Sequence, residues 1–258
     1  MCEQNDAGVT GLPVSVVVDS GSAPGAPDSD LLEELSAANR ILARYRVVDA
    51  FGHISVRHPH SSDHFLLARN MAPAQVKPAD VVTFSLDGTP VDAAGRGVYL
   101  ERFIHGEIYR LRPDVQSVVH SHAPAVVPFG IVEGAALRPV WHMSGFLGLK
   151  TPVFEIRHHG GEATDLLIRD RALGTALGEC LADNNVVLMR GHGATVVGDS
   201  IRQSVYRAVF TQVNAELQLQ AHQLGEINFL TAGECETASL SVGSQVDRAW
   251  NLWKEEVS

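Results

Sequence analysis

The fold is decided by residues 101–125, "ERFIHGEIYRLRPDVQSVVHSHAPA". In residues 101–112 apolar side chains recur at helical spacing, which predicts an amphipathic helix with Ile104 and Ile108 on its buried face. Residues 115–122 then switch to an apolar, β-branched run that is typical of a buried strand. The stretch therefore predicts a helix that leads into an interior strand.

Two histidines, His120 and His122, lie in this strand and are separated by Ser121. Because side chains alternate across a strand, both imidazoles point to one face and Ser121 points to the other. Such a pair can converge on a metal ion, or it can be two hydrogen-bonded core side chains. The H-x-H pattern by itself leaves both interpretations open.

Strand-like and helix-like segments alternate along the rest of the chain. Further helices are predicted over residues 30–46, 163–184, 200–224 and 248–256, further strands over 53–58, 64–69, 149–156 and 185–193, and a hairpin over 80–91. This alternation predicts one α/β domain over residues 28–258, built as a three-layer α/β/α sandwich. Residues 1–27 end in a run rich in Gly, Ala, Pro and Ser, so we expect a mobile N-terminal tail there.

The composition argues against several classes of function. The 258 residues carry a formal net charge of -10, which disfavours a nucleic-acid partner because phosphate binding needs clustered Lys and Arg. No apolar run approaches the ~18 residues that a membrane span needs, and the first residues lack a secretory signal pattern. We therefore expect a cytoplasmic protein without a membrane partner. The three cysteines are far apart and indicate neither a disulfide framework nor a zinc ribbon.

A third histidine, His192, lies between Gly191 and Gly193 after the predicted strand at 185–193. Glycines on both sides permit unusual backbone angles and a close approach to a bound group. The segment can also be a plain turn with an incidental histidine. Together with His120 and His122, however, His192 would complete a three-histidine set with an open position, which is typical of a catalytic metal site.

Glu101, at the start of the predicted helix, is the fourth candidate. A carboxylate in the first turn is favoured by the helix dipole, so it can be a plain helix-start residue. It can also lie beside the metal as a proton donor or acceptor. His105 is one turn further on the same face, where it could orient Glu101 or cover the core. We expect one divalent ion per subunit, with Zn as the default for imidazoles and Mn, Fe or Co as alternatives.

These motifs together resemble the class II aldolase/adducin family. The resemblance covers residues 31–224 and includes "GHISVR" at 52–57 and "LMRGHGATVVG" at 188–198. It implies the class II aldolase fold, in which the central sheet of the sandwich is mainly antiparallel or mixed, and a homotetramer with active sites at subunit interfaces. It also implies that His120, His122 and His192 hold the metal and that Glu101 is the catalytic acid/base. Adducin-type members lack the metal set, so its presence favours an enzyme over a non-catalytic, adducin-like scaffold.

The sequence departs from the sugar-phosphate aldolases of this family at all three of their phosphate-binding elements. His53 stands where they have Asn, Arg69 and Asn70 replace a small-residue stretch, and Tyr99 and Leu100 replace paired serines. Small residues suit phosphate because backbone N–H groups and hydroxyls must approach it closely. A phosphorylated sugar is therefore not the expected substrate.

The replacements predict an anionic aromatic substrate. Arg69 offers a planar fork for a carboxylate, Tyr99 and Leu100 give a flatter, more apolar pocket for a ring, and Asn70 lies beside Arg69. This pattern resembles the decarboxylases of the family that act on hydroxylated aromatic dicarboxylates, such as 3,4-dihydroxyphthalate or a hydroxypyridine dicarboxylate.

In that chemistry Glu101 would protonate the ring if burial raises its pKa, and His53 is the second candidate for the proton donor. The alternative enzyme is a metal-dependent aldolase of a non-phosphorylated hydroxy-keto acid. The roles of five further residues stay open, namely those of His105, His142, His158, His159 and Tyr206.

Overall fold

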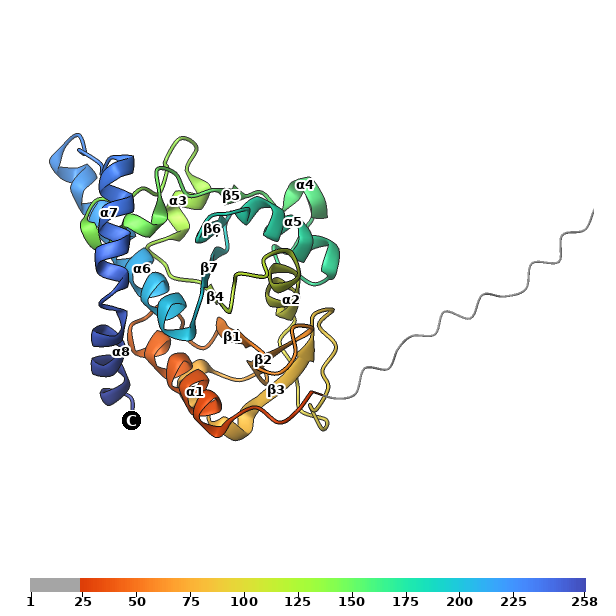
Figure 1. The fold of residues 1–258 in the computed structure, drawn as a ribbon. Helices are drawn as coiled ribbons and strands as arrows, with labels where there is room; N and C mark the ends of the chain where they lie inside the picture. The colour runs from red at the N-terminus through yellow and green to blue at the C-terminus, as the bar shows by residue number, and fades with distance from the viewer. Residues whose placement is uncertain (1–23) are drawn as a thin grey trace, which may run out of the picture.

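The computed structural model describes residues 24–258 (Figure 1). Residues 1–23, which make up most of the expected tail, lie outside the described residues. The first element is the helix α1 (Ser29–Arg44). None of the helices in residues 24–258 is long and apolar enough to cross a membrane.

A seven-stranded mixed sheet forms the centre of the molecule, in the order β3-β2-β1-β4-β7-β6-β5. Its strands are β1 (His53–Arg57), β2 (His64–Ala68), β3 (Val81–Ser85), β4 (Ser117–Ser121), β5 (Val153–Phe154), β6 (Val186–Met189) and β7 (Gly193–Gly198). Only β5 and β6 pair in parallel, and all other neighbours are antiparallel. The expected mainly antiparallel or mixed sheet is confirmed, and β4 is its central strand.

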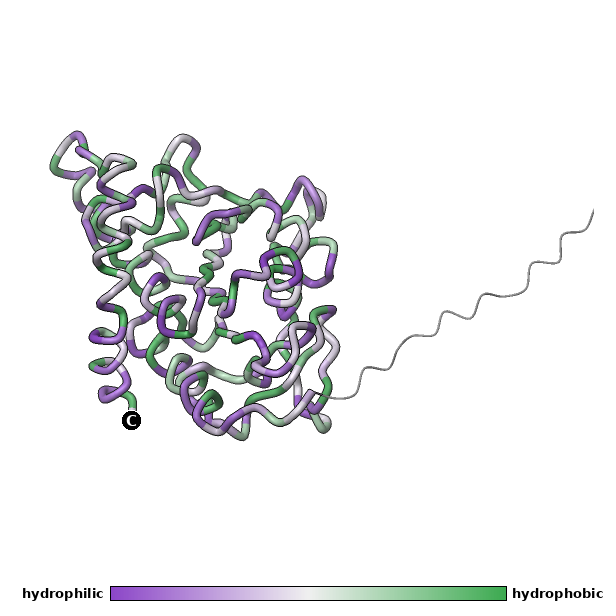
Figure 2. The backbone as a smooth tube through the Cα atoms, viewed as in Figure 1, coloured by the Kyte–Doolittle hydropathy of each residue, from purple (hydrophilic) through white to green (hydrophobic). Residues whose placement is uncertain are grey.

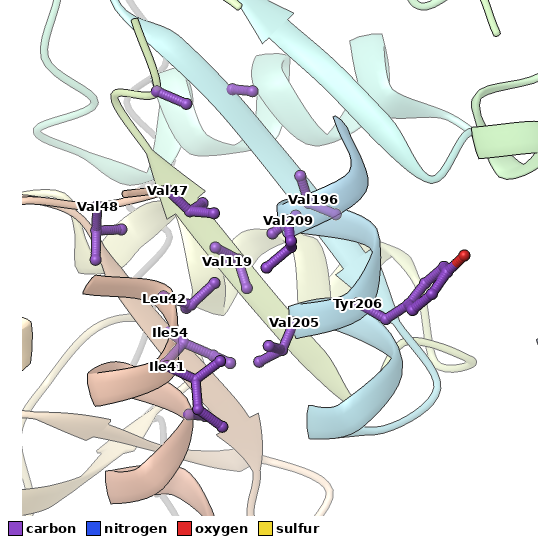
Figure 3. Close-up of a cluster of buried hydrophobic side chains, with 14 of the residues drawn as sticks. Ile41, Leu42, Val47, Val48, Ile54, Val119, Val196, Val205, Tyr206 and Val209 are labelled. Carbon is purple, nitrogen blue, oxygen red and sulfur yellow. The ribbon is translucent and has the colours of Figure 1, made fainter. Parts of the chain in front are cut away.

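Helices cover both faces of the sheet, as the three-layer prediction requires (Figure 1). One face packs against α1 and α6 (Ile201–Leu224), with α8 (Val246–Glu255) packed on these two helices, and the other face packs against α2 (Arg102–Leu111) and α5 (Arg171–Leu181). Adjacent residues of β4 serve the two layers, because Val119 packs with Val205 and Val209 of α6 (Figure 3), while Val118 packs with Ile108 of α2. A strand buried on both faces explains the continuous apolar run in its sequence.

The remaining elements are helices that belong to neither of these two groups. They are α3 (Val127–Ile131), α4 (Arg157–Gly160), α7 (Ala232–Gly243), and three 3-10 helices at Pro73–Gln75, Pro78–Asp80 and His142–Leu147. Along α8 hydrophilic and hydrophobic residues alternate (Figure 2), and its buried side chains, Val246, Trp250 and Trp253, recur at helical spacing. This periodicity matches the short helix predicted over 248–256.

The helix predicted over 163–184 is wrong in its first part. The structure has α5 only from Arg171, where the Asp170 side chain accepts a hydrogen bond from the backbone N–H of Leu173 and caps the helix. Leu166 has φ of 70°, which a right-handed helix cannot contain. Residues 163–170 are therefore an irregular segment whose backbone groups are free for other partners.

Two further elements differ from the sequence expectations. The strand β7 follows the turn at 190–192 and pairs back on β6, although only the strand at 185–193 was predicted. The helix α7 was missed because its apolar residues lack a clear helical period. The hairpin predicted over 80–91 is present on one side as β3, while its return limb makes a single bridge between Phe84 and Pro90.

Gly106 sets how closely α2 approaches the chain after β3. A Cβ atom at this position would lie 2.1 Å from the backbone oxygen of Leu86. We expect Gly106→Ala to lower the free energy of unfolding by about 3 kcal/mol, because backbone cannot give way as a flexible side chain can. Gly233→Ala in α7, where an added Cβ meets nothing within 4 Å, is the control and should raise stability by up to about 1 kcal/mol. Urea unfolding measures both, and equal effects would contradict the packing argument.

Glu107 joins α2 to α5 through a fully buried carboxylate. Its oxygens accept hydrogen bonds from Arg171 (2.7 Å), Arg110 (2.6 Å) and Thr175 (2.9 Å). Burial alone would raise the pKa of Glu107, but these donors lower it below its usual value. The carboxylate therefore contributes stability above the pKa of the unfolded chain and loses it as the pH falls through the lower pKa of the folded protein.

We expect Glu107→Gln to lower the free energy of unfolding at pH 7 by about 1–3 kcal/mol, since hydrogen bonds to a charged group are lost. The difference from the wild type should shrink as the pH falls below about 4, where the carboxyl group of the unfolded chain becomes protonated, and should continue to shrink down to the lower pKa of the folded protein. Glu179→Gln, at an exposed position of α5, is the control and should change stability by less than about 0.5 kcal/mol. A difference between Glu107→Gln and wild type that is independent of pH would contradict the account.

Candidate functional site

Strand pairing and one glycine bring the candidate metal ligands together. In the β1–β4 ladder His53 lies opposite His120, and β4 pairs on its other side with β7. His122 directly follows β4, next to Gly193 at the start of β7. A Cβ on Gly193 would lie 2.0 Å from the Ser121 oxygen, so a larger residue would push the two chains apart. Gly191 has φ of 66°, which supports the predicted turn around His192.

Three imidazoles and one carboxylate converge at this point. The Nε2 atom of His122 lies 3.0 Å from Nε2 of His120 and 2.9 Å from Nε2 of His192. The Oε2 atom of Glu101 lies 3.5 Å from Nε2 of His120 and 3.6 Å from Nε2 of His192. One ligand atom from each of the four residues falls within 4.8 Å of the others, so the group could hold a metal ion.

The protonation state of the imidazoles suits a cation. His192 donates through Nδ1 to the carbonyl oxygen of Leu166 at 2.9 Å, which leaves its Nε2 as a lone pair facing the cluster. Burial, with the charge of His120, lowers the pKa of both His122 and His192 to about 4. Neutral imidazoles with converging lone pairs are the form that binds metals, so these residues fit a divalent ion.

Glu101 enters the site as a carboxylate. Its Oε1 accepts a hydrogen bond from the backbone N–H of Ile168 at 3.0 Å, and its Oε2 faces the histidines. Burial opposes ionisation, but the charges of His120 and His192 and the Ile168 N–H lower the pKa of Glu101 to about 2. The condition under which Glu101 would protonate the ring directly, a pKa raised by burial, is therefore not met in the protein by itself. Glu101 must accept a proton before it can give one.

The segment 163–170 supports the site in a way that the sequence did not indicate. It provides the Ile168 N–H to Glu101 and the Leu166 carbonyl to His192. Both are backbone groups, which any residue type can supply. The only sequence signal is Asp170, a residue type favoured at N-caps, which would have placed the start of the helix after these residues.

His53 and Tyr99 lie beside the metal cluster. The ring of His53 is 5.2 Å from that of His120 and 4.5 Å from that of Tyr99, measured between centroids. Tyr99 is itself buried and hydrogen-bonds to the Met71 carbonyl. His105 makes no hydrogen bond to Glu101, because its Nε2 contacts Nδ1 of His53 at 2.7 Å. The structure therefore places His105 against His53 and not against Glu101.

Arg69 and Asn70 occupy the neighbouring loop. The Nε atom of Arg69 donates to Asp80 at 2.7 Å, and the side chain keeps 37% of its surface exposed. Burial raises the pKa of Tyr99, and the hydrogen bond with the Met71 backbone and the charge of Arg69 oppose this rise. Asn70 is exposed and tied through its backbone N–H to the Gly97 oxygen at 2.8 Å. Leu100 is 59% exposed.

A cavity of about 390 Å³ opens beside His122. Its wall includes Arg46, Asp49, Gln212 and Glu216, which the sequence did not single out. Arg69, Asn70 and Tyr99 are not part of this wall. The cavity next to His122 thus lies between the end of α1 and α6.

The other residues whose roles the sequence left open, three histidines and Tyr206, lie away from the cluster. His158 and His159 are exposed on α4, where His159 stacks on Phe154 at 5.5 Å. His142 is exposed as well. Tyr206 donates to the Met143 carbonyl at 2.8 Å within the packing of α6. The structure gives these residues local contacts and no contact with the four converging side chains.

Comparisons with known proteins show the family of the chain. Residues 33–219 match the family described as Class II Aldolase and Adducin N-terminal domain. The chain belongs to this family. A solved aldolase II superfamily protein from Pseudomonas syringae shares the fold, with a TM-score of 0.72 at 24% identity over 88% of this chain and 92% of that one.

Two curated relatives are named as decarboxylases. Decarboxylase tropJ from Talaromyces stipitatus is 43% identical over 84% of this chain and 90% of its own length. A 3,4-dihydroxyphthalate decarboxylase from Arthrobacter keyseri is 31% identical over 75% of this chain and 79% of its own. The chain is accordingly an enzyme of the carboxy-lyase class that acts on a small molecule, and the scaffold alternative is set aside.

Proposed function

We propose that this protein is a divalent-metal-dependent decarboxylase of a hydroxylated aromatic dicarboxylate, such as 3,4-dihydroxyphthalate or a hydroxypyridine dicarboxylate. The observation that carries the proposal is the convergence of His120, His122, His192 and Glu101 in a chain whose relatives are named decarboxylases. The family resemblance adds the expectation of a homotetramer with active sites at its interfaces.

The three histidines would hold the ion, and Zn, Mn, Fe or Co would all suit imidazole nitrogens. An ion held there would act as a Lewis acid and lower the pKa of a ring hydroxyl that it coordinates. Glu101 lies beside the histidine cluster and is ionised, so it can receive that hydroxyl proton.

The proton then changes position in the substrate. Glu101 accepts it from the ring hydroxyl and returns it to the ring carbon that bears the neighbouring carboxylate. The bond between that carbon and the carboxylate breaks, its electron pair restores the aromatic ring, and CO2 leaves. Water re-protonates the hydroxyl oxygen, so that overall a proton replaces the carboxylate.

The residues that replace the phosphate-binding elements would position the ring. Tyr99 offers a flat, buried face next to His53. Arg69 keeps its Nη atoms without a hydrogen-bond partner among residues 24–258, and we assign to them the carboxylate that is retained. Asn70 contributes an exposed amide at the same loop. His53 would hydrogen-bond to the substrate beside the metal.

Metal content tests the ligand assignment. We expect wild-type protein to bind about one Zn²⁺ per chain, and His120→Ala and His192→Ala to lose both the ion and the activity. His142→Ala, at an exposed histidine outside the cluster, is the control and should keep the metal. Metal analysis after dialysis measures this. Wild-type stoichiometry in both cluster variants would refute the assignment.

Substrate turnover tests the reaction. We expect metal-loaded protein to release CO2 from 3,4-dihydroxyphthalate and not from phthalate, which lacks the hydroxyl groups. Arg69→Ala should lower kcat/KM by about 10- to 100-fold, mainly through KM, because a hydrogen-bonded charge pair is lost. Arg248→Ala, at an exposed arginine of α8, is the control. Failure across hydroxylated aromatic dicarboxylates would contradict the proposal, and pyruvate release from a hydroxy-keto acid would point to an aldolase.

A further inference from the structure

A buried chain of hydrogen bonds leads from the interior of the molecule to His53. The hydroxyl of Tyr109 lies 2.8 Å from Oγ of Ser55, and this Oγ lies 2.6 Å from Nδ1 of His105. Nε2 of His105 then lies 2.7 Å from Nδ1 of His53. All four side chains are at most 3% exposed, so water does not compete for these bonds.

The direction of the chain follows from its inner end. Tyr109 has two acceptors within reach, Ser55 Oγ at 2.8 Å and the Gln116 carbonyl at 3.5 Å. The Gln116 carbonyl already accepts the backbone N–H of Arg57 at 2.8 Å. The shorter contact is the stronger hydrogen bond, so the Tyr109 hydroxyl donates to Ser55.

Each later group in the chain has a single hydrogen to donate, so the directions of the remaining hydrogen bonds follow. Ser55 has one hydroxyl hydrogen, and because its oxygen accepts from Tyr109, that hydrogen goes to Nδ1 of His105. Burial, with the charge of His120, lowers the pKa of His105 to about 3, so its ring is neutral and its proton lies on Nε2. Nε2 of His105 therefore donates to Nδ1 of His53.

The proton of His53 must then reside on Nε2. This nitrogen has no hydrogen-bond partner among residues 24–258. It is not one of the fully buried side-chain atoms that lack a partner, so it is accessible from outside the protein interior. The ring contacts both His120 and Tyr99. A neutral N–H thus faces the place where a substrate bound at the cluster would lie.

We propose that Tyr109, Ser55 and His105 form a positioning chain that fixes His53 in its Nε2–H tautomer, so that His53 donates a hydrogen bond to a carboxylate oxygen of the substrate. The inference rests on the proposed decarboxylase function for the identity of that oxygen. In this scheme His105 acts only through His53 and touches no reacting atom.

Two substitutions at His105 separate positioning from packing. His105→Met fills the buried space with an apolar side chain and removes the donor to His53. His105→Gln retains an N–H at about the place of Nε2. We expect kcat/KM with 3,4-dihydroxyphthalate to fall by about 10- to 100-fold in His105→Met, which is the loss of a hydrogen bond to a charged group, and to recover at least several-fold in His105→Gln.

Thermal unfolding of both variants provides the structural readout. If His105 only packs, activity should follow Tm, and the apolar methionine should be tolerated at least as well as the buried amide. Equal kcat/KM in the two variants, or better activity in His105→Met, would overturn the positioning role.

The tautomer itself can be observed without any substrate. Long-range ¹H–¹⁵N correlation spectra of ¹⁵N-histidine-labelled protein, with and without Zn²⁺, should show His53 protonated on Nε2, with the signal assigned by its loss in His53→Asn. Ser55→Ala removes the donor to His105 and should give a mixture of tautomers. His53 protonated on Nδ1 in the wild type would overturn the inference. If no decarboxylation is found but the Nε2–H tautomer is, the chain stands and the proposed function fails.

Discussion

The pairing of β4 between β1 and β7 is the constraint on which the site depends. This register sets His53 opposite His120 and places the end of β4 beside Gly193. A slip of one residue would turn His120 to the other face of the sheet, into the apolar layer beneath α6. The sheet fixes its register by burying both faces of β4, so the packing of Val118 and Val119 also orients the candidate metal ligands.

The converging ligands impose an electrostatic cost that the fold offsets only in part. The Nε2 atom of His122 lies 3.0 Å from that of His120 and 2.9 Å from that of His192, and burial lowers the pKa of His122 and His192 so that these two imidazoles are neutral. One carboxylate, Glu101, stays ionised beside them and gains one backbone N–H as a partner. A divalent cation would satisfy the lone pairs and the negative charge together, which is why this donor set suits a metal better than a purely structural role.

The sequence predicted those parts of the fold and the site that depend on local patterns. The helical period of 101–112, the apolar run of 115–122 and the glycines around His192 each gave the correct element, and His120, His122, His192 and Glu101 do converge. Residues 163–170 could not be predicted in the same way. Their apolar period resembles a helix, but their contribution to the site comes from backbone groups, which leave no residue signature.

The partners of His105 lay beyond sequence reasoning for a different reason. Its position one turn after Glu101 suggested contact within the helix, whereas the fold sets it against His53 and Ser55 on β1. Such cross-element bonds depend on how α2 crosses the sheet, and the close approach at Gly106 is one of the contacts that set this crossing.

The substitutions that argue against a sugar phosphate also have structural partners of their own. Tyr99 bonds to the Met71 carbonyl, and Arg69 pairs with Asp80. His53, which stands where the sugar-phosphate aldolases have Asn, is bonded to His105 within a buried chain of neutral groups. An asparagine would carry its own N–H and would need no partner to fix a tautomer, whereas an imidazole does. With His rather than Asn at position 53, the position of the proton on this side chain therefore depends on its hydrogen bond with His105, on the buried face of α2.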